Sequence, residues 1–493
     1  MSNMKKLLFV LSMMAATVCA QAGGLLHNTN QHIAFVRMMA RGASNEIDAV
    51  YTNPAGIAFM DHDGWTLSLN IQSAYQTRNI DATVMTPTGM GLFPNDTFNK
   101  KYKGDAAAPI LPSVYAAYKT PKWAVSGFVG VVGGGGKATF DDGLPLFDAA
   151  VMAGLYQQSA QLLQQYPMVA PAFGGPITPG QYYLDGYMKG RQYIFGGQLG
   201  FSYKFNDHFS AYAGFRANYF SGNYTGHVNA TAGEALATKM QQVAAIAGPV
   251  NPALAQMLVG MSGENGLAHI AIDCTQTGWG LTPILGVNFK WKGLTLAAKY
   301  EFKTNLNIEN DTKTLDAPAA FEGSLEPYKH GVNTPNDMPS VLYAAVGYEF
   351  IPKKLRGTVE YHYYDDKHAD MAGGKNKELK HGTHEILAGV EWDINKIFTV
   401  SAGFQRTDYG LSDKYQSNTS FSCDSYSIGL GGAINVSKNV KINVGYFWTT
   451  YSDYKKEMTA ADGGYNGISP ALTGSDVYSR TNKVFGAGVD FKF

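Results

Sequence analysis

Strand-like segments of alternating polarity recur along almost the entire chain and constrain its fold more than any other feature. From Trp65 to Gln72, apolar side chains alternate with polar ones, which is the period of a half-buried β-strand. The same alternation predicts fourteen strands, at residues 65–79, 110–119, 123–133, 191–205, 209–222, 276–290, 294–307, 339–350, 355–364, 384–392, 398–407, 422–435, 440–451 and 477–493. An even number of strands is what a closed bacterial outer-membrane barrel requires.

The connections between these strands alternate in length. The short ones are residues 121–122, 206–208, 291–293, 351–354, 393–396 and 437–439, and the long ones are 80–109, 134–190, 223–275, 308–338, 365–383, 408–421 and 452–476. Short turns at one rim and long loops at the other are typical of outer-membrane barrels. We therefore expect an all-β fold, a 14-stranded antiparallel transmembrane β-barrel that occupies residues 64–493.

The composition of the chain fits such a barrel. Charged residues make up 16% of it, against ~25% in typical soluble proteins. Lys plus Arg and Asp plus Glu number 39 each, so no basic surface for nucleic acid is expected. The 30 tyrosines, 26 phenylalanines and 56 glycines favour a β-rich protein whose outer surface faces lipid.

Residues 1–22 have the features of a cleaved signal peptide. Lys5 and Lys6 precede the short apolar run 7–18, and Ala20 and Ala22 supply small residues for the peptidase. A permanent anchor is the alternative reading, but the apolar run is too short to span a membrane. We expect secretion, cleavage and a multi-pass barrel in the bacterial outer membrane.

The stretch Asn53-Pro54-Ala55-Gly56 lies just before the first expected strand. We interpret residues 23–63 as a plug inside the barrel. Pro54 should begin a turn or helix and Asn53 should cap it. Strand parity places six charged residues in the lumen, and some of them should hold the plug: Arg216, Lys299, Glu301, Glu349, Glu360 and Glu391. Solvated charges that pair with one another are the alternative.

The segment from Ile33-Ala34-Phe35 through Arg41-Gly42-Ala43 to the 53–56 motif is similar to the hatch of the FadL-like long-chain fatty acid transporters. The resemblance covers the mature chain in architecture, and its motif is only three residues, Asn-Pro-Ala. It implies an outer-membrane channel that takes up long-chain fatty acids or similar oily molecules. It further implies capture at extracellular loops, movement of the hatch and lateral exit through a kinked third strand. The family's charged hatch partners do not map onto this chain, and Lys299 and Arg216 are only candidates for contacting a carboxylate.

The third expected strand ends in a glycine-rich run, in which Gly130, Gly133 and Gly134 are the candidate kink residues. Glycines weaken a strand and permit a bulge or gap. The alternative is a flexible lead into the following loop. Valine at Gly130 and Gly133 should impair uptake if the kink is an exit.

Two of the long loops contain apolar residues at helical spacing, near 147–166 and 235–261. These helices could pack on each other as a cap, or their flexible side chains could line a groove for an oily ligand. The candidate ligand contacts, with two from the plug, are Leu155, Leu162, Met240, Val243, Met257, Leu258, Phe35 and Met38.

Cys274 and Cys423 remain in the expected mature chain, and in an oxidising compartment they could form a disulfide or stay as thiols.

Two other functions remain as alternatives to uptake of oily compounds. An enzyme is one, but no nucleophile elbow is present and the histidine spacing matches no strong metal pattern. A general porin for polar solutes is the other, and a plug argues against it.

We expect no catalytic residues, no cofactor and no metal. The expected partners are a hydrophobic small molecule, outer-membrane lipids and, through Phe493, the barrel assembly machinery, and the protein should be a monomer.

Overall fold

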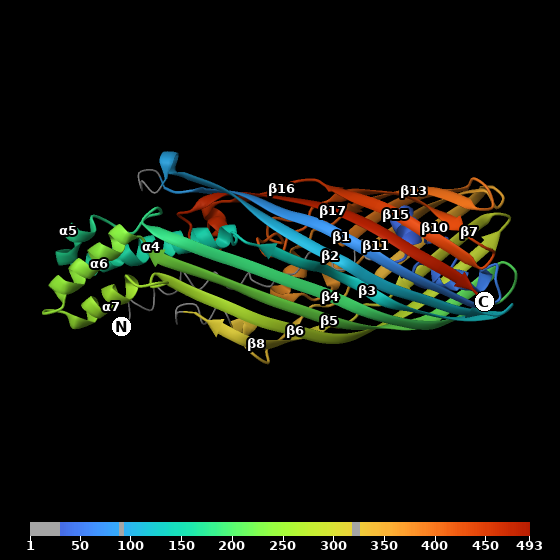
Figure 1. Cartoon of the computed structure of the whole chain (residues 1–493), viewed down its shortest axis with the longest axis horizontal. Coiled ribbons are helices and arrows are strands. Elements are labelled where there is room, and N and C mark those ends of the chain that lie inside the picture. Colours follow the sequence, from blue (N-terminus) through green and yellow to red (C-terminus); the bar gives the residue numbers. More distant parts are fainter. Residues whose placement is uncertain (1–29, 88–92, 318–325) are drawn as a thin grey trace.

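The computed structural model describes residues 30–87, 93–317 and 326–493, so the expected signal peptide lies outside the described residues. These residues form a closed antiparallel barrel of fourteen strands, in which each strand pairs with the next along the chain and β17 pairs with β1 (Figure 1). The barrel strands are β1 (Gly64–Met85), β2 (Thr97–Lys119), β3 (Trp123–Phe140), β4 (Tyr182–Lys204), β5 (Phe209–Ala232), β6 (Ala268–Trp291), β7 (Leu294–Glu301), β10 (Val341–Ile351), β11 (Leu355–Tyr364), β12 (Thr383–Asp393), β13 (Phe398–Asp408), β14 (Ser425–Asn435), β15 (Val440–Tyr451) and β17 (Thr473–Lys492). The expected fold class is confirmed.

Several strands are longer than the sequence pattern predicts. β2 begins at Thr97 instead of residue 110, and β4 begins at Tyr182 instead of residue 191. Crossing a bilayer takes ~9–11 residues, which is the length of β10 to β14. The extra length of β1 to β6 extends past the apolar belt on the loop side (Figure 1), where the outward side chains are mostly polar and the inward ones, such as Ile80 and Tyr102, stay buried.

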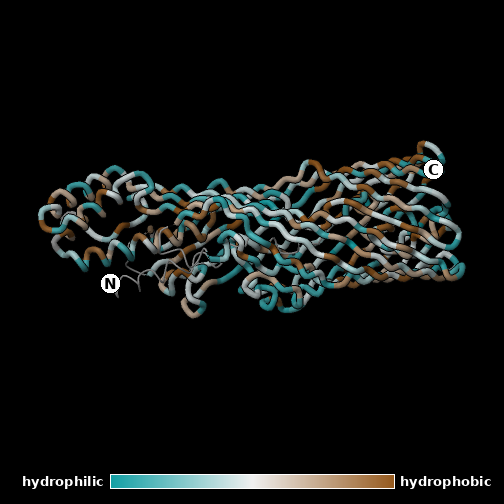
Figure 2. The backbone as a smooth tube through the Cα atoms, turned by 90° about the horizontal axis from the view of Figure 1, so that it is seen from below, coloured by the Kyte–Doolittle hydropathy of each residue, from teal (hydrophilic) through white to brown (hydrophobic). Residues whose placement is uncertain are grey.

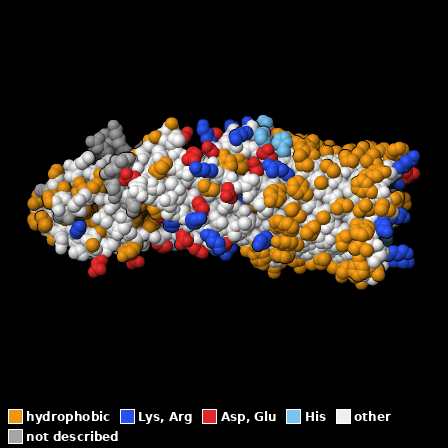
Figure 3. All heavy atoms as spheres, turned by 90° about the horizontal axis from the view of Figure 1, so that it is seen from above, with side chains coloured by type: hydrophobic (Ala, Val, Ile, Leu, Met, Phe, Trp, Pro, Cys, Tyr) orange, Lys and Arg blue, Asp and Glu red, His pale blue; other side chains and the backbone are white. Residues whose placement is uncertain are grey.

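The outer surface carries an apolar belt near the turn end of the barrel. Large apolar side chains such as Trp65, Leu69 and Ile71 are exposed there, and Figure 3 shows them gathered on that half of the molecule. Figure 2 shows the hydrophobic backbone segments concentrated in the same half and the hydrophilic ones between it and the helical end. On β1, the outward residues from Thr77 to Thr83 are polar, so Tyr75 marks the loop-side edge of the belt.

The seventh strand is shorter than expected. The sequence pattern predicts one strand over 294–307, but β7 ends at Glu301 and the short strand β8 (Asn307–Asp316) resumes the pairing with β6. Pro283 of β6 has no N–H to donate at this point, and its carbonyl accepts from Phe302 N. The chain between β7 and β8 fills the interruption, because Thr304 and Leu306 are fully buried. The other short strands are β9 (Asn333–Pro335) and β16 (Tyr454–Met458).

Helices cover the loop end of the barrel (Figure 1). They are α4 (Pro145–Gln165), α5 (Ala170–Phe173), α6 (Glu234–Ala247) and α7 (Pro252–Met261). Apolar residues of all four helices pack into one cluster with the ends of β4, β5 and β6. The first half of α4 also packs into a second cluster, which includes Val84 and Leu472. No helix among the described residues is long and apolar enough to cross a membrane.

The N-terminal residues 30–63, which we call the plug, fold inside the barrel near its turn end (Figure 1). They form α2 (Ile33–Arg37), α3 (Ala49–Thr52) and a 3₁₀ helix, Pro54–Phe59. Most of their side chains are buried. The plug therefore occupies the lumen where the apolar belt surrounds it.

The disulfide considered between Cys274 and Cys423 is not formed. The Cys274 thiol donates to the carbonyl of Thr275, and the Cys423 thiol donates to the carbonyl of Tyr478. The two cysteines belong to different parts of the wall, one within β6 and the other just before β14.

Candidate functional site

The motif Asn53-Pro54-Ala55-Gly56 is fixed to the barrel by small polar side chains. Asn53 Nδ2 donates to Asn288 Oδ1 at 2.8 Å. The hydroxyls of Ser202 and Ser210 donate to the carbonyls of Pro54 and Ala55, each at 2.7 Å. The motif therefore contacts three adjacent strands, β4, β5 and β6.

Within the plug, Pro54 begins the 3₁₀ helix as expected, but Asn53 does not cap it with its side chain. The Asn53 amide instead donates to Ser44 O at 3.1 Å as well as to Asn288. Gly56 packs against the same amide, because a Cβ added there would lie 2.4 Å from Asn53 Nδ2. Gly56 is thus required by close packing.

Three of the expected lumen charges bind the plug directly. Lys299 Nζ donates to Tyr51 O at 2.7 Å, and Glu360 Oε2 accepts from Gly42 N at 2.9 Å. Glu391 forms an ion pair with Arg37 of α2 and lies 3.5 Å from Arg41 Nη1.

The other three expected charges differ in their roles. Arg216 and Glu301 form a buried ion pair, and the Arg216 guanidinium lies 5.5 Å from the centre of the Tyr51 ring. Glu349 does not reach the plug, since its carboxylate accepts from Lys353 N at 3.3 Å in a turn at the rim. Burying ion pairs costs desolvation that good geometry only offsets, so these contacts position the plug more than they stabilise the fold.

Sequence reasoning missed the uncharged residues that hold the plug. Gln72 Nε2 donates to Asn30 O at 2.9 Å, Asn70 Oδ1 accepts from Ile33 N at 3.1 Å, and Gln198 Nε2 donates to Val50 O at 2.7 Å. Polar residues occupy many inward positions of such strands, so only the plug's path distinguishes these residues from their neighbours.

The pairing between β2 and β3 is interrupted in the middle of both strands. The ladder joins residues 104–107 to 137–140 and residues 114–119 to 124–129, but no pairs join 108–113 to 130–136. We call this interruption the β2–β3 break. The register between β3 and β4 also shifts twice, at Val131/Gly133 and at Gly133/Gly136. The three expected kink residues, Gly130, Gly133 and Gly134, all lie in the break.

The local sequence explains the break. Pro109 and Pro112 of β2 have no N–H to donate to a neighbouring strand. On the β3 side, Gly134 and Gly136 have φ angles of +108° and +71°, which L side chains rarely adopt. A Cβ at Gly134 would lie 2.4 Å from Gln192 O. The glycines of β3 indicate only one side of the break. The two prolines of β2 are the sequence signal for its other side.

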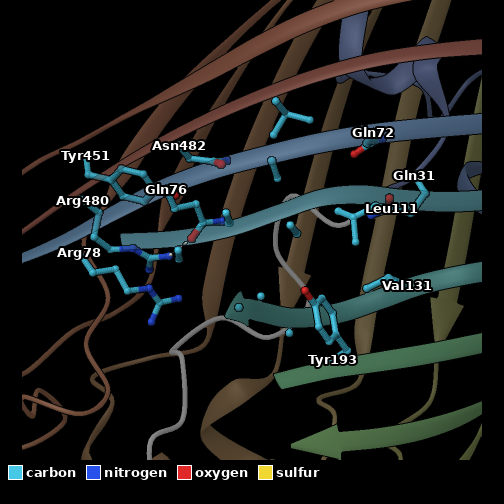
Figure 4. A pocket seen from close by; sticks show the side chains of 18 of the residues that line it. Gln31, Gln72, Gln76, Arg78, Leu111, Val131, Tyr193, Tyr451, Arg480 and Asn482 are labelled. Atoms are coloured by element: carbon cyan, nitrogen blue, oxygen red, sulfur yellow. Dashed lines mark hydrogen bonds between the residues drawn. The ribbon is translucent and has the colours of Figure 1, made fainter. Parts of the chain in front are cut away.

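A cavity of about 80 Å³ lies against the break on the lumen side (Figure 4). Its lining comes from the plug, β1, β2, β3, β4, β15 and β17, and includes Gln31, Gln72, Gln76, Arg78, Leu111, Val131, Tyr193, Tyr451, Arg480 and Asn482. A second cavity of about 50 Å³ shares Arg78, Gly135 and Gly136 with it. A third, of about 1250 Å³ among the outer loops, shares Asn418 and Thr419 with the second. The three cavities thus form a series from the loops to the break.

Two arginines face the cavity from paired positions, Arg78 on β1 and Arg480 on β17. Arg78 lies on the loop side of Tyr75, outside the apolar belt. Burial and the neighbouring Arg480 lower the pKa of Arg78 to about 9. This end of the cavity therefore carries excess positive charge.

The structure does not bring the candidate ligand contacts into one site. Leu155, Met240, Val243 and Leu258 are buried in the helical cap with Leu162 beside them, and Met257 is exposed. Phe35 and Met38 belong to a separate cluster between the plug and the wall, with Leu387, Phe447 and Val484. The helices bury their apolar faces against each other and against the ends of β4, β5 and β6. The helices therefore pack on each other as a cap, which is one of the two arrangements expected for them.

No protein-family model and no curated protein matches the sequence. Solved structures do match the fold. A Pseudomonas aeruginosa FadL homologue superposes with a TM-score of 0.61 at 15% identity, over 96% of this chain and 100% of that one. The P. putida toluene transporter TodX superposes with a TM-score of 0.52 at 13% identity, over 94% and 99%. A TodX deltaS2S3 mutant, described as a monoaromatic hydrocarbon channel, gives 0.52 at 14% identity, over 91% and 95%. The chain therefore has the fold of the FadL-like outer-membrane β-barrels.

Proposed function

We propose that this protein is an outer-membrane channel for the uptake of hydrophobic compounds, such as long-chain fatty acids or similar oily molecules. The observation that carries the proposal is the β2–β3 break beside a lumenal cavity. The plug fills the lumen between this cavity and the turn end of the barrel. A molecule that enters from the loops therefore reaches the break before it reaches the plug. The fold shared with a toluene transporter supports the same reading.

In this proposal a ligand is captured among the extracellular loops and descends through the series of cavities. The cavity at the break is too small for a whole long-chain molecule, so transport requires movement. Gln31 of the plug lines that cavity, and its carbonyl accepts from the Ser113 hydroxyl of β2 at 3.2 Å. A shift of residues 30–32 enlarges the cavity and lets the ligand leave sideways into the membrane.

Filling the cavity tests the exit directly. Ala108 lies at the edge of the break and is buried against the cavity, so Ala108→Trp should reduce uptake of a radiolabelled long-chain fatty acid at least tenfold. Ala344→Trp, on the lipid-exposed face of β10, is the matched control and should leave uptake unchanged. Heat-modifiable gel migration verifies that both barrels fold. Normal uptake through a folded Ala108→Trp barrel would overturn the lateral route.

A general porin for polar solutes would need an open lumen, and so would conduct ions. The buried plug and its hydrogen bonds favour a closed one. Intact protein in planar bilayers should give no large steady current.

We further propose that the protein is a monomer surrounded by outer-membrane lipids, and that the assembly machinery recognises the end of β17 at Phe493.

A further inference from the structure

Three basic residues lie together on β3 and β4, directly on the loop side of the β2–β3 break. Lys137 and Arg191 are partners in the β3–β4 ladder, and Lys189 is the partner of Thr139, two positions further along. Residues opposite each other have Cβ atoms about 4.5–5.5 Å apart, and diagonal neighbours about 7–8 Å. Like charges in these positions destabilise a sheet, so the cluster requires a compensating anion.

The three side chains belong to the outer face of the barrel. On β4, Met188 and Gln192 are buried against the lumen, so the alternating residues Lys189 and Arg191 face outward. The next outward positions toward the turn end are Tyr193 and Phe195, and Phe195 is 45% exposed in the apolar belt. Because tyrosines mark the membrane interface, Arg191 lies at the level of the lipid headgroups. Figure 3 shows charged side chains gathered on this side of the belt.

Protein carboxylates do not compensate these charges. Within the described part of the chain, none of the three cations forms an ion pair, and β3 and β5 contain no carboxylate. The outward carboxylates of β2 and β4 have other partners. Asp105 binds Lys103 and Asp185 contacts His227 Nε2, each at 3.0 Å. Lys137 and Arg191 are exposed, so an anion can reach them from outside the barrel.

The surface between this cluster and the turn end is apolar. Ile110 lies within the break and is 70% exposed, and Val129, where the ladder stops, is 64% exposed. A cationic cluster followed by exposed apolar surface is complementary to an anionic lipid, which offers a charged headgroup and acyl chains in the same order. Guanidinium and ammonium groups both bind phosphate. A soluble partner reaches this wall only by entering the headgroup layer, which lipids already fill.

We propose that Lys137, Lys189 and Arg191 bind the phosphate of an anionic lipid in the loop-side leaflet, and that the acyl chains of this lipid cover the outer face of the β2–β3 break. The phosphate offsets the repulsion between the paired cations. The inference rests on the outer-membrane location and on the geometry of the break. It does not depend on transport.

The test compares two lipid probes in nanodiscs of phosphatidylcholine that contain the purified protein. One probe is a phosphatidate with a photoactivatable diazirine in an acyl chain, and the other is the diacylglycerol with the same chains and no phosphate. After illumination, peptide mapping should find labels within 108–113 and 129–136 about tenfold more often with the phosphatidate, a ratio that corresponds to about 1.4 kcal/mol. Equal labelling of the break by both probes would overturn the inference.

The variant Lys137→Gln/Arg191→Gln should reduce phosphatidate labelling of the break to the level of the diacylglycerol. It removes like-charge repulsion from an exposed face, so it should fold, and heat-modifiable gel migration verifies this. Arg406→Gln/Lys483→Gln is the matched control, because it removes the same two residue types from the outer faces of β13 and β17, and it should label as wild type. Unchanged labelling in the first variant would overturn the inference.

A competition experiment distinguishes a lipid from a free anion. Millimolar inorganic phosphate should leave phosphatidate labelling of the break unchanged, because the acyl chains also contribute to binding. Loss of labelling under these conditions would assign the cluster to free phosphate and overturn the lipid site. Fatty acid uptake is not a readout in any arm, so failure of this inference leaves the proposed function standing.

Discussion

At the scale of single residues, the plug is held by polar contacts that are individually weak and collectively specific. Asn53 and Asn288 bond each other at 2.8 Å in a buried site. Removing one partner leaves the other buried and unsatisfied, which costs about 1–3 kcal/mol. The barrel strands are held together by their own backbone hydrogen bonds. Losing such a contact should therefore destabilise the plug and leave the barrel wall intact.

Asn288→Ala should therefore loosen the plug without unfolding the barrel. Amide hydrogen exchange of residues 49–60 should speed up by roughly tenfold or more, given about 1–3 kcal/mol lost. Exchange in β6 should stay slow. Asn439→Ala, in an exposed turn, serves as control, and unchanged exchange in the plug of Asn288→Ala would show that this contact does not hold it.

At the scale of elements, the sequence predicts the wall well and the site poorly. Alternating polarity located all fourteen strands because every membrane-crossing strand obeys it. It failed beyond the belt, where β2 and β4 continue for several residues past the predicted starts, and at β7, where Pro283 interrupts the ladder. The glycines of β3 marked the break, but its other half depends on Pro109 and Pro112. The ligand contacts expected in the loop helices instead form the core of the cap, since helical periodicity alone cannot distinguish a core from a groove.

Restoring donors to β2 should close the break. Pro109→Ala with Pro112→Ala returns two backbone N–H groups that can pair with β3. Amides of residues 130–133 should become protected from exchange, and fatty acid uptake should fall severalfold. Pro283→Ala in β6 is the matched control and should leave uptake unchanged. This test is cleaner than valine at Gly130, where a Cβ would lie 2.8 Å from the Phe128 ring and disturb packing in any case. Faster uptake after the double change would contradict the account.

At the scale of the whole molecule, the proposed function makes the plug the element that converts a wide barrel into a conduit with a side exit. Its contacts extend from β1 through β6 to β12, so it ties opposite walls together. Removing it would leave Lys299, Glu360 and Glu391 facing water in an open lumen. The barrel should survive, because its ladder closes without the plug.

Deletion of residues 23–60 should therefore give a folded barrel that conducts ions. Planar bilayers should show a large steady current for the deletion variant and little for the intact protein, and selective uptake should be lost. A deletion barrel that assembles but neither leaks nor loses selective uptake would remove the plug from the mechanism.

The central claim is that ligands leave through the β2–β3 break, and a reversible clamp across it is the most direct measurement. A Cβ built at Gly136 lies 3.8 Å from the Cβ of Ala108, which is the usual Cβ separation of a disulfide. Ala108→Cys with Gly136→Cys should therefore cross-link the strands, although the left-handed backbone at residue 136 costs about 1–2 kcal/mol. Uptake of a long-chain fatty acid should be low in the oxidised protein and return to the rate of the single-cysteine Ala108→Cys variant after reduction. Equal uptake before and after reduction, with the cross-link verified by mass spectrometry, would contradict lateral exit.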